Sequence, residues 1–246
     1  MMEQRADQAL VARGLAQSRA RARALIEDGN VTVDGVVVAR PAELICEEQV
    51  LALTAPDFPY VSRGALKLVA ALDHFRIDPT GARCLDLGAS TGGFTDVLLR
   101  RGAAHVTAMD VGHDQLHDSL RQRDEVTVLE GRNARELTAE DVPEPVDIIV
   151  CDVSFISLTL VLPPALARAA PGARLIALVK PQFEAGRKAL GKSGVVRSAE
   201  IRAEVLTRMT AWLAEQPGWR VRGSIESPIT GPKGNVEYLL VGDRGS

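Results

Sequence analysis

Short apolar runs and helix-like stretches alternate along this chain, and their spacing divides it into two parts. In the first part we expect the helices Arg5–Arg13 and Ser18 to about Asp28, then the strands Val31–Val33, Val36–Val38 and Gln49–Thr54. Asp34-Gly35 lies between two β-branched runs and indicates a hairpin turn. The pattern predicts a small α+β domain over residues 1–54, followed by a stiff, proline-containing linker over residues 55–62.

From residue 63 onward, apolar strands alternate with helical patterns. The expected strands are Arg83–Leu87, His105–Met109, Val126–Leu129, Val146–Cys151, Arg174–Val179, Arg220–Ile225 and Val236–Val241. Continuous apolar stretches such as Ile148–Val150 fit strands that are buried on both faces. Because strands alternate with helices, we expect an α/β domain over residues 63–246 with a mostly parallel, seven-stranded sheet.

The composition is that of an ordinary globular protein, with 246 residues, 46% hydrophobic residues, 25% charged residues and a formal net charge of −3. No apolar run reaches the length of about 18 residues that a membrane-spanning helix needs. The charged N-terminus lacks the apolar core of a signal peptide. The three cysteines are far apart, which fits neither a disulfide framework nor a zinc site and indicates a reducing, cytoplasmic setting.

Residues Cys84 to Thr95 read C-L-D-L-G-A-S-T-G-G-F-T and are the most informative stretch of the chain. A strand, a glycine-rich turn and a helix make a nucleotide-cofactor site, because glycines allow close approach and the first helical N–H groups point at the ligand. Asp110 ends the next strand, at about the ~20-residue offset where an acid meets ribose hydroxyls. The spacing is not G-x-G-x-x-G and resembles the first motif of S-adenosyl-L-methionine-dependent methyltransferases. That resemblance implies cofactor binding by Asp86, Gly88, Ser90, Thr91, Gly92, Gly93, Phe94, Thr95, Asp110 and Asp152.

Charged residues stand at the ends of three expected strands. Asp152 and Lys180 each follow a buried strand, and Glu237 stands at the start of the last one, while Lys67 lies on the helix before the first. Buried charges are costly unless they are paired, so we expect the four to converge. The set resembles the Lys-Asp-Lys-Glu tetrad of FtsJ-type RNA ribose 2′-O-methyltransferases. In such a site desolvation lowers a lysine pKa, and Lys180 is expected to take the 2′-hydroxyl proton.

Other chemistries fit less well. Asp152-Val153-Ser154-Phe155 lacks the prolines of enzymes that methylate exocyclic amines, and Cys151, the candidate thiolate for carbon-5 methylation, is expected to point away from Asp152. His113 and His117 have metal-ligand spacing but no evident third ligand, so no metal is expected. The basic, glycine-containing stretch of residues 186–194 fits either a lid or an ordinary exposed loop.

The N-terminal part resembles the S4-type RNA-binding domain. The matching residues are Arg5-x-Asp7-x-x-Leu10, Gly14-Leu15, Ser18-Arg19-x-x-Ala22, Ile26-x-x-Gly29-x-Val31-x-Val33-x-Gly35 and Pro41. Arg19 and Arg23 lie four apart on one helix face and are expected to meet phosphates. The RNA-binding residues that we expect are Arg5, Ser18, Arg19, Arg23 and Arg63.

An S4-type module joined to an FtsJ-like domain resembles one family, the TlyA (haemolysin A-like) rRNA 2′-O-methyltransferases. The resemblance implies a Rossmann-like fold and methylation of cytidines in the rRNA of ribosomal subunits, with no membrane partner. Large-subunit specificity is expected, since the chain stops soon after its final strand, without the C-terminal helix of longer members. The linker, Phe58-Pro59-Tyr60-Val61, departs from the Arg-x-Trp-Val of some members. The alternatives are an RNA-binding assembly factor with an inactive methyltransferase domain, and a membrane-active haemolysin.

Overall fold

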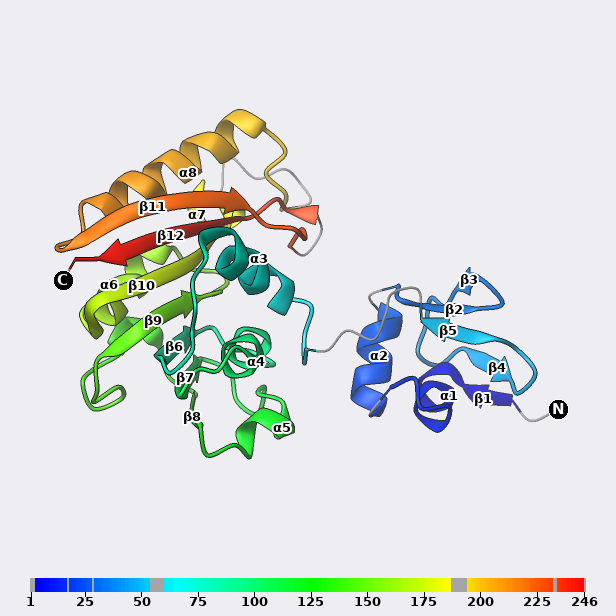
Figure 1. Cartoon of the computed structure of the whole chain (residues 1–246). Helices are drawn as coiled ribbons and strands as arrows, with labels where there is room; N and C mark the ends of the chain where they lie inside the picture. The colour runs from blue at the N-terminus through cyan, green and yellow to red at the C-terminus, as the bar shows by residue number, and fades with distance from the viewer. Residues whose placement is uncertain are drawn as a thin grey trace. The chain divides into compact units, whose positions relative to one another are not determined.

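The computed structural model describes residues 3–16, 18–27, 29–53, 60–186, 194–231 and 234–245. The chain forms two compact units, Met1–Pro59 and Tyr60–Ser246 (Figure 1). Most of the expected linker and of the basic loop after residue 186 lies outside the described residues, so those two expectations stay predictions. The expected domain boundaries at residues 54 and 63 also stay predictions.

The N-terminal unit packs two helices against short strands. They are α1 (Ala6–Ala12), α2 (Arg19–Glu27), β2 (Val31–Val33), β3 (Val36–Val37) and β5 (Leu51–Leu53), with β1 (Glu3–Arg5) paired to β4 (Leu44–Cys46). The turn between β2 and β3 has φ of 51° at Asp34 and 83° at Gly35, as a two-residue hairpin with matching twist requires. Leu10, Ile26 and Ile45 fill the core beneath the helices.

A seven-stranded sheet forms the centre of the second unit, in the order β11-β12-β10-β9-β6-β7-β8. The strands are β6 (Arg83–Leu87), β7 (His105–Asp110), β8 (Val126–Glu130), β9 (Val146–Cys151), β10 (Ala169–Val179), β11 (Trp219–Glu226) and β12 (Tyr238–Arg244). The five adjacent strands β10, β9, β6, β7 and β8 run parallel to one another. β12 runs antiparallel to both of its neighbours, β10 and β11. The expectation of a mostly parallel α/β sheet is confirmed.

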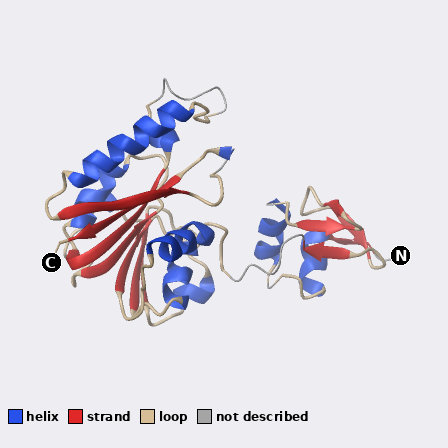
Figure 2. Cartoon of the chain, turned by 45° about the horizontal axis from the view of Figure 1, so that its top comes forward, coloured by secondary structure: helices blue, strands red, loops and turns tan. Residues whose placement is uncertain are grey.

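Helices cover both faces of this sheet (Figure 2). On one side, α3 (Ala65–Phe75) packs against β12, and α4 (Gly93–Arg100) packs against β6 and β7. On the other side, α6 (Leu158–Leu166) packs against β10, and α8 (Ala199–Ala214) packs against β11 and β12. Shorter elements are α5 (Asp118–Arg121), the 3₁₀ turn η1 (Ala134–Glu136) and α7 (Pro181–Glu184). Leu85, Ile149 and Leu175 are fully buried between the layers, which explains the continuous apolar runs.

The strand order reverses between β6 and β9, since the chain leaves β6 toward β7 and β8 and later returns to its other side. A crevice opens at such a point, at the carboxyl ends of the strands. Because β12 is antiparallel, its first residue, Tyr238, pairs with the last residue of β10, Val179. The final strand was expected to begin at Val236, so Glu237 in fact lies just before it, at the same edge as the other strand ends.

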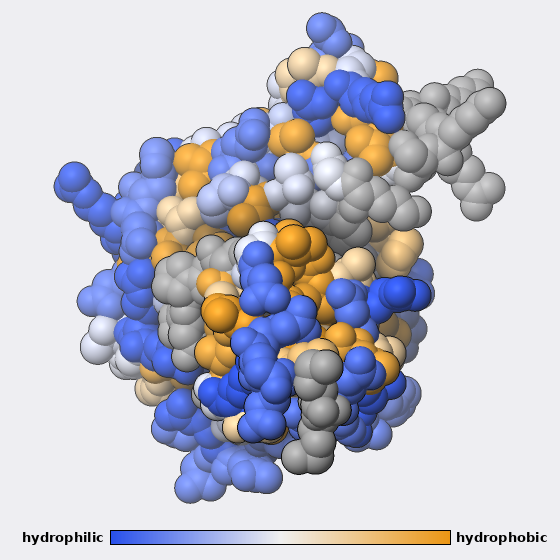
Figure 3. Space-filling model, turned by 90° about the vertical axis from the view of Figure 1, so that its right-hand side faces the viewer, coloured by the Kyte–Doolittle hydropathy of each residue, from blue (hydrophilic) through white to orange (hydrophobic). Residues whose placement is uncertain are grey.

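Figure 3 shows one face of the molecule, on which hydrophilic residues surround smaller apolar areas. None of the helices in the described ranges combines the length and apolarity that a bilayer crossing would require.

Candidate active site

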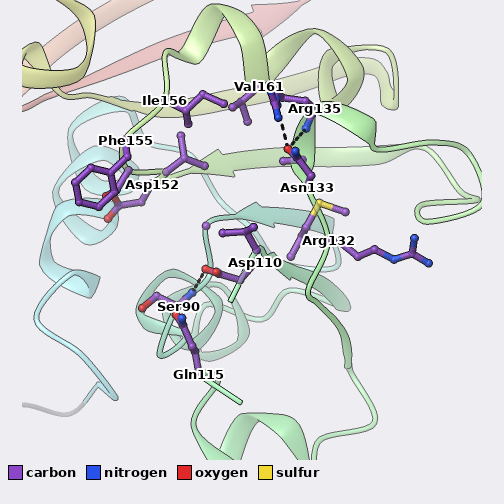
Figure 4. A pocket seen from close by; sticks show the side chains of 16 residues that line it. Ser90, Asp110, Gln115, Arg132, Asn133, Arg135, Asp152, Phe155, Ile156 and Val161 are labelled. Carbon is purple, nitrogen blue, oxygen red and sulfur yellow. Dashed lines mark hydrogen bonds between the residues drawn. The ribbon is translucent and has the colours of Figure 1, made fainter. Parts of the chain in front are cut away.

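A cavity of about 440 Å³ lies at the reversal point of the sheet (Figure 4). Four of the expected cofactor residues line it: Gly88, Ser90, Asp110 and Asp152. The other lining residues are Met109, Val111, Gln115, Arg132, Asn133, Ala134, Arg135, Val153, Ser154, Phe155, Ile156 and Val161. Residues 132–135 follow β8, so the same strand-end argument that found Asp152 would have found them.

The turn after β6 needs glycine for two different reasons. Gly88 has a φ of 80°, and a Cβ there would lie 2.8 Å from the backbone oxygen of Asp152. A Cβ on Gly93 would lie 2.2 Å from the Oγ of Ser62, and this contact packs the start of the second unit onto the turn. A side chain at Gly88 would therefore push apart two segments that line the cavity, and one at Gly93 would displace Ser62.

Asp110 holds the turn in place through both of its carboxylate oxygens. Its Oδ2 accepts a hydrogen bond from the N–H of Ser90 and its Oδ1 one from the N–H of Gly112, both at 2.8 Å (Figure 4). Each oxygen has a second lone pair, so the carboxylate can still accept bonds from a ligand. Ser90 itself adopts a φ of 49°, which turns its N–H toward Asp110.

Asp86 is fully buried behind the turn. Its Oδ2 accepts a 2.7 Å hydrogen bond from the Oγ1 of Thr95, whereas its Oδ1 has no partner among the described residues. Burial raises the pKa of the Asp86 carboxyl to about 7, although the bond from Thr95 acts in the opposite direction. A buried acceptor without a donor favours a ligand that brings a positive charge or an N–H group.

The remaining expected cofactor residues support the cavity without lining it. Gly92, Gly93, Phe94 and Thr95 are buried at the start of α4, and Thr91 is exposed. The backbone oxygen of Thr91 accepts a bond from the N–H of His117. Their assignment as cofactor ligands stays a prediction.

The four residues of the expected tetrad meet at the carboxyl edge of the sheet. The Lys67 Nζ lies 2.7 Å from Oε2 of Glu237 and 3.7 Å from Oδ2 of Asp152, and the Lys180 Nζ lies 2.5 Å from Oδ1 of Asp152. The lysine side chains are 8% exposed, that of Asp152 is 20% exposed and that of Glu237 is fully buried. Two positive and two negative charges thus alternate in one line, and each buried charge has an opposite neighbour.

The Lys180 end of this line contacts two residues that line the cavity, Asp152 and Ser154. Its Nζ also donates a 2.9 Å hydrogen bond to the Oγ of Ser154, an exposed residue that lines the cavity. The Lys180 Nζ and Oδ1 of Asp152 form an ion pair at 2.5 Å. This contact does not have the geometry of a hydrogen bond, and Oδ1 of Asp152 has no hydrogen-bond partner among the described residues. Lys180 is therefore held by one carboxylate and one hydroxyl, both from residues that line the cavity.

Phe155 stands beside this lysine with its side chain 91% exposed and a φ of 66°. Its ring centre lies 5.0 Å from that of Phe183, and the Lys180 Nζ lies 6.0 Å from the Phe183 ring centre. An exposed aromatic ring on a strained backbone is unfavourable in isolation and is typical of a surface that receives a planar ligand. The composition, with few aromatics, gave no sign of it.

Cys151 is the candidate nucleophile of the carbon-5 alternative. It is fully buried, and burial raises the pKa of its thiol to about 12, with the neighbouring Asp152 adding to this effect. A thiol of this kind does not supply a thiolate near neutral pH. The site therefore fits a base-assisted transfer better than a thiolate-dependent one.

The arginines of the N-terminal unit converge on one carboxylate. Asp7 is fully buried; Arg5 binds it through two nitrogens at 3.0 and 3.1 Å, and Arg19 and Arg23 each through one at 3.2 Å. The bond from Arg5 is the main reason why the pKa of the Asp7 carboxyl lies far below its usual range. The side chains of the three arginines stay 36%, 51% and 54% exposed, so they form one cationic surface, and their contact with phosphates stays a prediction.

The other expected RNA residues, Ser18 and Arg63, are both exposed. Ser18 precedes α2, and its backbone oxygen accepts the N–H of Ala22. The described residues contain no group of three or more His, Cys, Asp and Glu arranged to hold a metal ion. His117 accepts the N–H of Ser119 at the start of α5.

Comparison with known proteins matches both units. The FtsJ-like methyltransferase model matches residues 60–244 and the S4 domain model residues 4–51. The chain is 49% identical over 237 residues to the 16S/23S rRNA (cytidine-2'-O)-methyltransferase TlyA of Mycobacterium tuberculosis, covering 96% of this chain and 88% of that protein. It is 38% identical over 236 residues to Hemolysin A of Brachyspira hyodysenteriae, covering 96% and 98%.

A solved structure from Streptococcus thermophilus matches with a TM-score of 0.78 at 41% identity, over 100% of this chain and 90% of that one. The family match spans the whole second unit, which carries the glycine turn, the cavity and the four paired charges. The chain belongs to the FtsJ-like methyltransferase family, and within it to the TlyA-type members that carry an S4 domain.

Proposed function

We propose that this chain transfers a methyl group from S-adenosyl-L-methionine to the ribose 2′-hydroxyl of a cytidine in rRNA. The observation that carries the proposal is the ion pair of Lys180 with Asp152, a residue that lines the cavity, at 2.5 Å. The similarity to the rRNA (cytidine-2'-O)-methyltransferase of M. tuberculosis supports the acceptor group and the nucleotide. That relative is named for both 16S and 23S rRNA. The large-subunit RNA alone is the narrower proposal, and the 23S rRNA (cytidine-2'-O)-methyltransferase TlyA of Campylobacter jejuni, 40% identical over 182 residues, supports it.

The cavity fits the proposed cofactor on two grounds. The glycine turn brings backbone close to it, and Asp110, which lines it, has lone pairs to spare for hydroxyl groups. Residues 132–135 and Val111 would line its far end. When bound, S-adenosyl-L-methionine supplies an electrophilic methyl group on a sulfonium.

Positioning of the ribose hydroxyl and transfer of its proton would depend on the side chains of the protein. A neutral Lys180 would accept the 2′-hydroxyl proton, and Asp152 would stabilise the ammonium that results. Glu237 would hold Lys67, and Lys67 would orient the second oxygen of Asp152. Phe155 would stack on the base and so bring the ribose to Lys180. General base catalysis of this kind contributes about 10²–10⁴-fold, and alignment of the reacting groups adds to it.

The N-terminal unit would bind the RNA backbone. Three half-exposed guanidinium groups around one buried carboxylate leave an excess of positive charge on that surface. Such a surface binds phosphates without reading sequence, and salt weakens the binding. Arg63 and Ser18 are the further contacts that we propose. Since Cys84 and Cys151 are buried and unpaired, a reducing cytoplasm remains the setting that we propose.

This function is tested by incubating each ribosomal subunit separately with the enzyme and methyl-labelled cofactor. Label on the 2′-oxygen of a cytidine in the large subunit is expected, and label on the small subunit would contradict the narrower proposal. An inactive assembly factor would bind the subunits and leave no label. The name of the Brachyspira relative favours a membrane-active protein; leakage of liposomes at low protein concentration would support that candidate, and we expect none.

A further inference from the structure

We propose that Gln182 is a positioning residue of the active site, which holds the Glu237 carboxylate in place so that Glu237 can orient Lys67. This inference rests on the proposed role of the four paired charges. It adds a fifth residue to them, at the end of the line that lies farthest from the cavity.

The Glu237 carboxylate is held from two sides. Its Oε2 receives the Lys67 Nζ at 2.7 Å, and its Oε1 receives the Nε2 of Gln182 at 3.4 Å. Glu237 is fully buried and Gln182 nearly so, and no water-exposed edge of this carboxylate remains. A buried carboxylate needs donors at both oxygens, and the amide supplies the second one without adding a charge.

The backbone also makes room for the same carboxylate. A Cβ on Gly231 would lie 2.1 Å from Oε1 of Glu237, so any larger residue there would displace it. The N–H of Gly231 donates to the backbone oxygen of Asn235, which closes the loop before β12. Gln182 and Gly231 thus flank the oxygen that Lys67 leaves free.

The amide of Gln182 is expensive to bury. Its Oε1 has no hydrogen-bond partner among the described residues, and an unpaired buried acceptor destabilises a folded protein. A methionine would fill a similar volume without this cost. The reverse orientation of the amide would place its oxygen against the Glu237 carboxylate, so the donation to Glu237 fixes the side chain. A polar side chain kept at such a cost is typical of a functional site.

The Gln182–Glu237 contact joins two segments of the proposed active site that are far apart in the sequence. Gln182 lies on α7, which begins directly after Lys180. Glu237 lies just before β12, whose first residue pairs with Val179. The Gln182–Glu237 contact therefore ties the segment that carries the proposed base to the segment that carries the last charge of the line.

A double-mutant cycle between Gln182→Met and Glu237→Gln tests the proposal. Initial rates are measured with large ribosomal subunits from cells that lack the enzyme, at saturating and limiting cofactor and subunit concentrations. Gln182→Met should lower kcat about 10-fold to 100-fold, the loss typical of one hydrogen bond to a charge, with KM values for both substrates within twofold. In the Glu237→Gln background it should lower kcat by less than about twofold, because the group that it positions is gone.

Gly231→Ala provides a second way to displace Glu237 and should give the same loss of kcat alone. Gln216→Met is the matched control, since the Nε2 of Gln216 donates to the backbone oxygen of Trp212, a local contact at the end of α8. Equal losses from Gln182→Met in both backgrounds, or no loss in the wild type, would overturn the role of Gln182. Full activity of Glu237→Gln would instead overturn the proposed role of the tetrad, so the two failures are distinguishable.

Discussion

The Lys67 Nζ and the Glu237 Oε2 lie 2.7 Å apart, although 170 positions separate the two residues in the sequence. Lys67 comes from the first helix of the second unit and Glu237 from the loop before its last strand, so this contact closes the unit on itself. Glu237 is fully buried, and removal of one member of such a pair leaves an uncompensated charge, at a cost of about 3–5 kcal/mol. The pair joins the stability of the unit to the geometry of its site.

Gly88→Ala is expected to weaken cofactor binding at least tenfold. The new Cβ would lie 2.8 Å from the backbone oxygen of Asp152 and would push that residue from the cavity. The left-handed φ of 80° adds about 1–2 kcal/mol of strain. Calorimetric titration with S-adenosyl-L-methionine measures the change.

Gly81→Ala is the matched control for this glycine. Gly81 has a φ of 72°, but a Cβ there has nothing within 4 Å. It should therefore cost a similar strain and leave cofactor affinity unchanged. If both variants lose the same affinity, strain alone accounts for the loss and the close approach to Asp152 does not matter.

Asp86→Asn is expected to make the stability of the cofactor-free protein less sensitive to a rise in pH from about 4 to about 7. Burial raises the pKa of the Asp86 carboxyl from 3.8 to about 7, so the folded state holds its proton more tightly than the unfolded state. The resulting contribution to stability is complete below about pH 4, and about 4 kcal/mol at most is lost as the pH rises through 7. Asparagine stays neutral throughout.

Denaturant unfolding at pH 5 and pH 8 tests this prediction. From pH 5 to pH 8, the free energy of unfolding of the variant should rise relative to that of the wild type. A difference between the two proteins that is independent of pH would show that Asp86 is ionised in the folded protein.

Asp7→Asn is expected to weaken RNA binding even though it removes a negative charge. The three arginines that bind Asp7 would lose the carboxylate that holds them together and would repel one another. Exposed Glu48 provides the control, since Glu48→Gln changes the charge of the same unit without touching the cluster. Binding of labelled rRNA is measured at several salt concentrations, with thermal unfolding to verify the fold. Equal affinities for the two variants would contradict the positioning role of Asp7.

The sequence predicted most of the second unit because its strands are continuous apolar runs. β6 and β9 have the expected bounds, and the charges at the strand ends meet as expected, because the topology brings those ends to one edge. The strands β1 and β4 were missed: each has three residues, too few for a period to appear. β10 also begins earlier, at Ala169, and its register shifts before Arg174.

The sequence did not predict contacts that depend on packing between distant segments. Arg19 and Arg23 were expected to meet phosphates, which stays a prediction; their bonds to Asp7, which the packing of α1 against α2 places beneath them, were not expected. Ser154, Phe155 and Gln182 lie beside expected residues in the sequence, yet their types alone gave no reason to select them. Only the fold shows that Ser154 accepts a bond from Lys180 and that Gln182 donates to Glu237.

Mass-spectrometric mapping of ribose methylation on large-subunit rRNA, after incubation with the wild type and with Lys180→Ala, tests the central claim most directly. The wild type should add one methyl group to the 2′-oxygen of a cytidine, whereas the variant should bind the cofactor nearly as well and transfer methyl at least 100-fold more slowly. A variant that methylates the same cytidine at the wild-type rate would contradict the account, because no proton acceptor would then be needed at the position that pairs with Asp152.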